Sequence, residues 1–143
     1  MAACEAVEWR RILYAQNNPG VPIYDDVRTL TAERLAADGI AVDVITGGFP
    51  CQDVSVAGRR AGLDGQRSGL WSEIVRLIRE IRPQFVIVEN VGGLLSGPSE
   101  RPGGWFGRVL GDLAALGYDA RWCVLGADDG GESNRSEERR VGK

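Results

Sequence analysis

The feature that most constrains this chain is a six-residue segment, GGFPCQ, at positions 47–52. It directly follows an apolar run, residues 40–45 (IAVDVI), that is typical of a buried β-strand. Two glycines permit a sharp turn after a strand, and a proline and a cysteine follow that turn. Open α/β sheets bind their ligands at the carboxyl ends of the strands. The segment therefore predicts that the Cys51 thiol lies at the ligand-binding edge of a sheet.

A second apolar run, residues 85–88 (FVIV), ends in Glu89 and Asn90. This spacing predicts a carboxyl group at the end of another strand of the same sheet. By itself, a lone cysteine is more often a buried structural residue, and a strand-end acid often caps the following helix. We interpret the thiol and the carboxyl group together as the working groups of an enzyme that modifies pyrimidines.

The remaining pattern alternates helices and strands. Apolar spacing and stop residues predict helices over residues 7–16, 32–37 (capped by Thr31), 70–81 and about 105–116, and strands over 21–24, 40–46, 84–89 and 118–125. Segments 53–69 and 92–104 are expected to be loops. The helix over 70–81 has the clearest apolar stripe: Leu70, Ile74, Leu77, Ile78 and Ile81. Its charged residues Arg76, Arg79 and Glu80 are expected on the solvent side.

This alternation predicts an α/β fold with a mostly parallel sheet and helices on both faces. A nucleotide-binding α/β domain normally opens with a strand and a glycine-rich turn. Here residues 1–5 (MAACE) look like the end of a second strand. We therefore expect the first strand and its glycine loop to be missing.

Composition excludes several kinds of chemistry. The chain has no histidine, which excludes Ser-His-Asp and Cys-His catalysis as well as histidine metal sites. Its three cysteines lack CxxC spacing, so neither a disulfide framework nor a metal site is expected. The net charge of -3 fits an autonomous nucleic-acid binder poorly, so a DNA role must use local arginines. Without a membrane-length apolar run or a signal peptide, we expect a cytoplasmic protein with no membrane partner.

Three segments in order, residues 47–52 (GGFPCQ), 62–71 (GLDGQRSGLW) and 88–91 (VENV), resemble the motifs of DNA (cytosine-5)-methyltransferases. The resemblance runs from about residue 2 to residue 127. It implies an incomplete Rossmann-like methyltransferase domain that uses S-adenosylmethionine. It also implies transfer of a methyl group to carbon 5 of cytosine in double-stranded DNA, with the target cytosine flipped out of the helix.

The resemblance gives the two strand-end groups their roles. Cys51 is the nucleophile that adds to carbon 6 of cytosine, a covalent step to which a thiol is well suited. Glu89 hydrogen-bonds the ring nitrogen N3 and the exocyclic amine. Asn90 braces the loop that contains Pro50 and Cys51.

The resemblance also places a cofactor site and a DNA-contacting loop. Glu5 matches the acid that binds the ribose hydroxyls, Asp26 and Val27 match the pair that meets the adenine, and Pro50 and Leu70 match residues that line the pocket. Asp26 fits a simple turn residue equally well, and Leu70 fits a core residue. Gln52, Ser55 and Arg67, with Arg59 and Arg60, match the loop that closes over the flipped base; a solvated arginine loop is the alternative.

The chain departs from the family pattern at both ends. Besides the first strand, we expect the target recognition domain and the closing strand and helix to be missing, and residues 128–134 do not match the arginine motif that the resemblance implies. Residues 135–143 resemble a translated sequencing-adapter read, with a charged tail as the alternative. We therefore expect a partial catalytic domain over residues 1–127 and a non-matching tail over 128–143. Alone, such a chain is expected to be inactive and to bind S-adenosylmethionine weakly or not at all.

Three functional hypotheses follow. The first is a fragment of a methyltransferase of the kind paired with restriction enzymes or carried by phages. The second is a non-catalytic remnant, or one part of a split methyltransferase that needs a partner, because missing strands leave an exposed sheet edge. The third is a thiol-addition enzyme acting on free pyrimidine nucleotides, which the lack of a phosphate-binding arginine cluster with histidine weakens.

Overall fold

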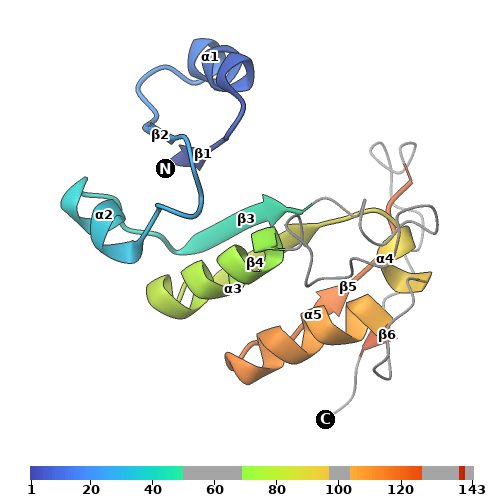
Figure 1. The fold of residues 1–143 in the computed structure, drawn as a ribbon. Helices are drawn as coiled ribbons and strands as arrows, with labels where there is room; N and C mark the ends of the chain where they lie inside the picture. The colour runs from blue at the N-terminus through green and yellow to red at the C-terminus, as the bar shows by residue number, and fades with distance from the viewer. Residues whose placement is uncertain (50–68, 97–103, 127–138, 141–143) are drawn as a thin grey trace.

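The structure, a computed structural model, describes residues 1–49, 69–96, 104–126 and 139–140. Helices and strands alternate along most of the chain (Figure 1), which confirms the predicted α/β class. The strands are β1 (Ala3–Cys4), β2 (Ile23–Tyr24), β3 (Val44–Gly48), β4 (Phe85–Glu89), β5 (Arg121–Trp122) and β6 (Arg139–Arg140). The helices are α1 (Glu8–Asn17), α2 (Ala32–Ala37), α3 (Gly69–Ile81), α4 (Gly93–Ser96) and α5 (Gly104–Ala115). None of these helices combines the length and the apolar character needed to cross a membrane, within the described residues.

The strands form three pairs. β1 pairs with β2 and β3 pairs with β4, both in parallel, whereas β5 and β6 are antiparallel. The predicted strand over 40–46 begins only at Val44, because Ile40 and Val42 pack on a core cluster without joining a ladder. It also extends through both glycines of the GGFPCQ segment, to Gly48. The predicted strand over 118–125 is limited to β5.

The larger core cluster lies between the β3–β4 pair and helices α3 and α5. Along both strands every second residue is partly buried, and Ile45, Val86 and Val88 pack on this cluster. Its buried members are Phe49, Trp71, Ile78, Leu94, Val109, Leu113 and Leu116. Trp71 and Ile78, both from α3, are the largest fully buried side chains in the described part of the chain. The predicted stripe of α3 therefore faces the sheet as expected.

The outer face of the same strand pair is open in the part of the chain that the structure describes. Val44, Phe85 and Ile87 are 45%, 64% and 60% exposed. The expected cover on both faces is thus present on one face only. The reason is topological: a right-handed crossover from β3 through α3 to β4 places α3 on one side of the pair, and α5 packs beside it (Figure 1).

A second core cluster joins α3 to the β1–β2 region. Its buried members are Tyr24, Leu30, Leu35 and Leu77, from β2, the connection after it, α2 and α3. Ile45 of β3 packs against this cluster as well as the larger one. The two clusters therefore link the two parallel strand pairs through α3.

Several helix ends follow from local sequence. The Thr31 hydroxyl accepts a hydrogen bond from the Arg34 amide (3.1 Å), which confirms the predicted N-cap of α2. Gly39 after α2 and Gly117 after α5 have φ angles of +72° and +88°, a conformation in which glycine commonly ends a helix. The helix predicted over 7–16 is present as α1, but its apolar residues are exposed, with Trp9 at 61%.

The expected loop over 92–104 is wrong in one part, because it contains the short helix α4. Leu94 of this helix is buried in the larger core cluster. A helix is predicted from apolar residues that repeat with the helical period, and one buried leucine in a single turn gives no such repeat.

The β3–β4 ladder places Gly48 directly beside Glu89. A β-carbon on residue 48 would lie 3.0 Å from Oε2 and 3.2 Å from the carbonyl oxygen of Glu89. At Gly47, the nearest atom to such a carbon would be Cδ1 of Ile74, at an ordinary 3.8 Å. The absence of a side chain at residue 48 therefore allows Glu89 its position at the end of the ladder.

Ile78→Ala should lower the free energy of unfolding by about 2–5 kcal/mol, because it removes a fully buried side chain and leaves a cavity. Ile87→Ala is the matched control. Ile87 is 60% exposed, so the same truncation there should cost about 0.5 kcal/mol or less. Urea denaturation followed by circular dichroism measures both. Equal losses would contradict the central place given to α3.

Gly48→Ala should displace Glu89 and lower the free energy of unfolding by about 1–3 kcal/mol, because the new methyl group crowds the Glu89 carbonyl. Gly47→Ala serves as the control, since its methyl group meets only Ile74 at contact distance. Amide chemical shifts of residues 88–90 report the displacement, and urea denaturation reports the stability. Wild-type shifts in the Gly48→Ala protein would refute the crowding argument.

Candidate functional site

The end of the β3–β4 pair is held together by a side-chain amide. Asn90 donates a hydrogen bond from Nδ2 to the carbonyl oxygen of Phe49 (2.9 Å), and its Oδ1 accepts one from the amide of Val91 (2.9 Å). Because both ends of the amide have partners of the right polarity, its orientation is fixed. The Phe49 ring packs on Trp71 with the ring centroids 5.3 Å apart. The residue that precedes Pro50 is therefore anchored through its backbone and through its side chain.

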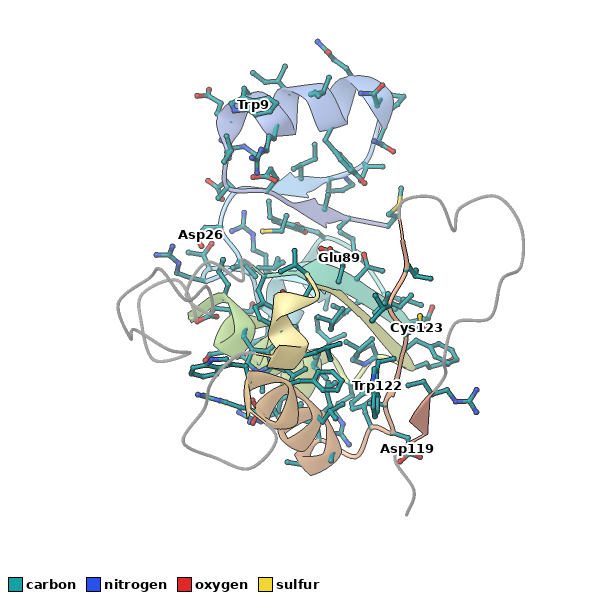
Figure 2. The ribbon with its side chains drawn as sticks, turned by 90° about the vertical axis from the view of Figure 1, so that its right-hand side faces the viewer. Trp9, Asp26, Glu89, Asp119, Trp122 and Cys123 are labelled. Atoms are coloured by element: carbon teal, nitrogen blue, oxygen red, sulfur yellow. The ribbon has the colours of Figure 1, made fainter. Side chains whose placement is uncertain are left out.

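Glu89 lies at this same end, as Figure 2 shows. It is the last residue of β4 and is exposed, with its carboxylate close to the backbone of Gly48. An exposed carboxylate at the carboxyl end of a parallel strand is available to a ligand. The structure thus brings together Glu89, Asn90 and the start of the cysteine segment.

Several predicted site residues lie outside the described residues. They are Pro50, Cys51, Gln52, Ser55 and Arg67, together with Arg59 and Arg60. The structure describes the residues on either side of this segment, Phe49 and Gly69.

The end of the β1–β2 pair gathers acidic side chains. The Glu5 amide donates to the Tyr24 carbonyl (2.9 Å), so Glu5 and Asp25 leave neighbouring strands side by side. Burial raises the pKa of the Cys4 thiol, and the negative charges of Asp26, Asp25 and Glu5 raise it further. These three carboxylates therefore all lie near enough to the Cys4 thiol to act on its charge. In Figure 2, Asp26 and Glu89 lie at similar heights, below the β1–β2 pair and above α5.

The Glu5 side chain already contacts the start of α1. Its Oε1 accepts a hydrogen bond from the Val7 amide (2.8 Å) at the start of α1, and its Oε2 lies 4.0 Å from the Arg10 guanidinium. Oε2 therefore has only a long ion pair, and the side chain is 32% exposed. A ribose hydroxyl would have to compete with this ion pair for that oxygen.

Asp26 forms the turn that the sequence offered as an alternative. Its Oδ1 accepts from the Arg28 amide (2.9 Å), and its carbonyl accepts from the Thr29 amide (3.2 Å) and hydroxyl (3.0 Å). Its Oδ2 accepts no hydrogen bond from the described residues, and the side chain is 41% exposed. A turn residue with one free carboxylate oxygen can still accept a ligand's amine. Both roles are compatible in this geometry.

Of the three apolar residues assigned to the cofactor, the structure describes two, and both are partly buried. Val27 packs against the smaller core cluster and Leu70 against the larger one. Leu70 therefore has the core contacts that the sequence left open as an alternative, while part of its surface stays accessible.

A separate hollow of about 190 Å³ lies between α2 and α3. Its lining residues are Ala32, Leu35, Ile40, Val42, Glu80 and Ile81. It is smaller than a typical ligand pocket, which spans roughly 300–1,000 Å³, and none of the predicted site residues lines it. No group of three potential metal ligands occurs among the described residues.

The solvent-side position expected for Arg76 is wrong. Its guanidinium is 28% exposed and bonds Glu73 and Glu80 on α3, as well as the carbonyl oxygens of Val27 and Leu30. The helical pattern could not predict these hydrogen bonds, because every residue has a backbone carbonyl and the sequence does not indicate which ones Arg76 contacts. The spacing of Glu73, Arg76 and Glu80 was the one available signal, and it is equally typical of ordinary surface ion pairs.

Comparison with known proteins identifies the relatives of this chain. The Type II methyltransferase M.Sau3AI of Staphylococcus aureus is 37% identical over 125 residues, covering 85% of this chain and 29% of the relative. M.NlaIV of Neisseria lactamica is 35% identical over 120 residues, covering 81% and 27%. M.Bsp6I of Bacillus sp. (strain RFL6) is 36% identical over 129 residues, covering 90% and 39%. The chain thus spans well under half the length of these relatives.

The family comparison covers nearly the whole chain. A family model described as C-5 cytosine-specific DNA methylase matches residues 1–139. The matched region includes both strand ends described above and the GGFPCQ segment between Gly47 and Gln52. The chain therefore belongs to the C-5 cytosine-specific DNA methylase family.

Proposed function

We propose that this chain is part of an enzyme that transfers a methyl group from S-adenosylmethionine to carbon 5 of cytosine in DNA. The observation that carries the proposal is the end of the β3–β4 pair. There the backbone of Phe49, two residues before Cys51, is tied to Asn90, and Glu89 lies beside Gly48. Family membership supports DNA cytosine methylation in general terms.

The chemistry requires a nucleophile and an acid at one place. Carbon 5 of cytosine is a poor nucleophile until the Cys51 thiolate adds to carbon 6, which makes carbon 5 enamine-like. One Glu89 oxygen accepts a hydrogen bond from the exocyclic amine of the base, and a proton held between the other oxygen and N3 stabilises the negative charge that the addition pushes into the ring. When bound, S-adenosylmethionine supplies an electrophilic methyl group. Water then takes the carbon-5 proton, the electrons of that bond form the double bond between carbons 5 and 6, and the sulfur of Cys51 leaves carbon 6 as the free thiolate.

The β1–β2 end fits the cofactor's adenosine. The free Oδ2 of Asp26 is an acceptor for the adenine amine, and the side chain of Val27 next to it is apolar. Glu5 would hold the ribose hydroxyls through Oε2, and Pro50 and Leu70 would complete the pocket wall. The incomplete Rossmann-like fold that we assign to the chain would place this pocket at the carboxyl ends of the parallel strands.

DNA recognition is assigned to the segment that follows the nucleophile. Gln52, Ser55 and Arg67 would contact the flipped cytosine and the DNA backbone, because carbon 6 cannot be reached inside the base stack. The relatives are Type II methyltransferases, so we propose a restriction-modification context with a cognate restriction enzyme. A split or partner-dependent form is the second candidate. The observation favouring it is the exposed apolar face of Val44, Phe85 and Ile87.

Cys51 should form a covalent adduct with DNA that carries 5-fluorocytosine at the target site, because fluorine at carbon 5 blocks release after methyl transfer. The assay uses this chain joined to the further segments of a Type II relative, with S-adenosylmethionine present. Gel electrophoresis under denaturing conditions detects the adduct. Cys51→Ser should abolish it, and Cys123→Ser, at an exposed cysteine, should not. An adduct that survives Cys51→Ser would overturn the assignment.

Glu89→Gln should reduce the methylation rate by about 10²–10⁴-fold, as expected for loss of a group in general acid–base catalysis. DNA binding should change much less, since the amide keeps the size and polarity of the side chain. Methyl transfer from labelled S-adenosylmethionine and a gel-shift assay measure the two quantities. A rate change of only a few-fold would assign Glu89 a structural role instead.

A further inference from the structure

The connection between β2 and α2 carries Asp26 and Val27 and is folded by its own hydrogen bonds. The Asp26 carboxylate and carbonyl accept from Arg28 and Thr29, which closes a turn. The carbonyl oxygens of Val27 and Leu30 are not used by this turn. They bond instead to a side chain that comes from a distant part of the sequence.

That side chain is Arg76 in the middle of α3. Its Nη2 donates to Val27 O and to Leu30 O, at 2.9 Å in each case. Its Nε donates to Glu73 Oε2 (2.7 Å) and its Nη1 to Glu80 Oε1 (2.9 Å). Two carboxylates on the same helix therefore fix the plane of the guanidinium, which in turn fixes two backbone carbonyls.

Glu80 extends the same contact to the start of α2. Its Oε2 accepts a hydrogen bond from the Ala32 amide (3.3 Å) while its Oε1 holds Arg76. Helix α3 thus holds the connection both within its turn and after it. This set of contacts, from Arg76 and Glu80 to residues 27, 30 and 32, is called the α3 clamp below.

Only an arginine can make the clamp in this form. Its planar fork presents donors in three directions at once, whereas the lysine ammonium is a single point on a flexible stem. Partial burial disfavours the charge, but the hydrogen bonds to Glu73 and Glu80 outweigh burial and raise the pKa of Arg76 above its ordinary value. The hydrogen bond from Arg76 lowers the pKa of Glu80. The clamp is consequently charged throughout the neutral range.

We propose that Arg76 is a positioning residue for S-adenosylmethionine. By fixing the carbonyls of Val27 and Leu30, it holds the turn so that Asp26 Oδ2 and the Val27 side chain face the adenine. The inference rests on the proposed function, because it takes from there the assignment of Asp26 and Val27 to the cofactor. It adds Arg76, in the middle of α3, to a site that already includes Leu70 near the start of that helix.

The test compares Arg76→Lys with Glu73→Gln in this chain joined to the further segments of a Type II relative, because the 143 residues alone are expected to bind S-adenosylmethionine weakly or not at all. Arg76→Lys keeps the positive charge but cannot bond both carbonyls and both carboxylates. Glu73→Gln weakens one partner of the same guanidinium and leaves its bonds to Val27 and Leu30 in place, which makes it the matched control. Nuclear magnetic resonance gives two readouts: hydrogen exchange at the amides of residues 28, 29 and 32, and the amide shifts of Asp26 and Val27 on addition of millimolar S-adenosylmethionine.

Arg76→Lys should speed exchange at those amides by about tenfold or more, as expected for loss of charge-assisted hydrogen bonds, and should weaken the response to S-adenosylmethionine. Glu73→Gln should preserve both. Unchanged exchange in Arg76→Lys would overturn the proposal. Faster exchange with an unchanged cofactor response would overturn it too, because Arg76 would then serve stability alone. A wild-type chain without any shift at Asp26 and Val27 would refute the cofactor assignment itself, whatever the exchange rates show.

A wild-type measurement covers the case in which Arg76→Lys does not fold. Ordering of the turn and cofactor binding are reciprocally linked, so S-adenosylmethionine should slow exchange of the Arg76 Nε proton in the unaltered chain. Slower exchange supports the positioning role. Shifts at Asp26 and Val27 without any change at the Arg76 Nε proton would count against it.

Discussion

The burial of one helix face holds this molecule together. Trp71 and Ile78 of α3 are 1% and 0% exposed, and they pack against the inner face of the β3–β4 pair. The indole nitrogen of Trp71 also donates to Asp112 of α5 (2.8 Å), which keeps a polar atom of a buried ring satisfied. Arg82, just past the end of α3, donates to the Leu116 carbonyl (2.9 Å). Helix α3 is therefore fixed to the sheet, to α5 and to the β2–α2 connection, and the positions of Phe49, Asp26 and Val27 depend on these contacts.

Much of the fold was predictable because its causes are local. The apolar stripe of α3 repeats with the helical period, and the Thr31 cap and the glycines at 39 and 117 mark helix ends through backbone rules that act within a few residues. What could not be predicted depends on partners far away in the sequence. The open outer face at Phe85 follows from which elements surround the strand, and the short helix α4 packs on the core through one buried residue, Leu94.

The candidate site likewise has features that were predictable from the sequence and features that were not. The strand ends that carry Glu89 and Asp26 were predictable from apolar runs followed by acids. The bond from Asn90 to Phe49 and the closeness of Gly48 to Glu89 depend on the ladder register, which a sequence does not state. The Arg76 contacts were missed for a related reason, since their acceptors are backbone carbonyls. The roles of Cys51 and its neighbours remain predictions, because those residues lie outside the described part of the chain.

The contact between Phe49 and Trp71 has a consequence for variation in length. These rings lie against each other, with centroids 5.3 Å apart, although the whole segment 50–68 separates them in the sequence. Bringing the two rings together costs conformational entropy. This cost rises only with the logarithm of the intervening length, by about 0.6 kcal/mol for each doubling. Insertions or deletions between Phe49 and Trp71 should thus change the free energy of folding only slightly while the ring contact is kept. Proteins built on this plan are free to change the number of residues between Phe49 and Trp71 without moving the strand end at Phe49.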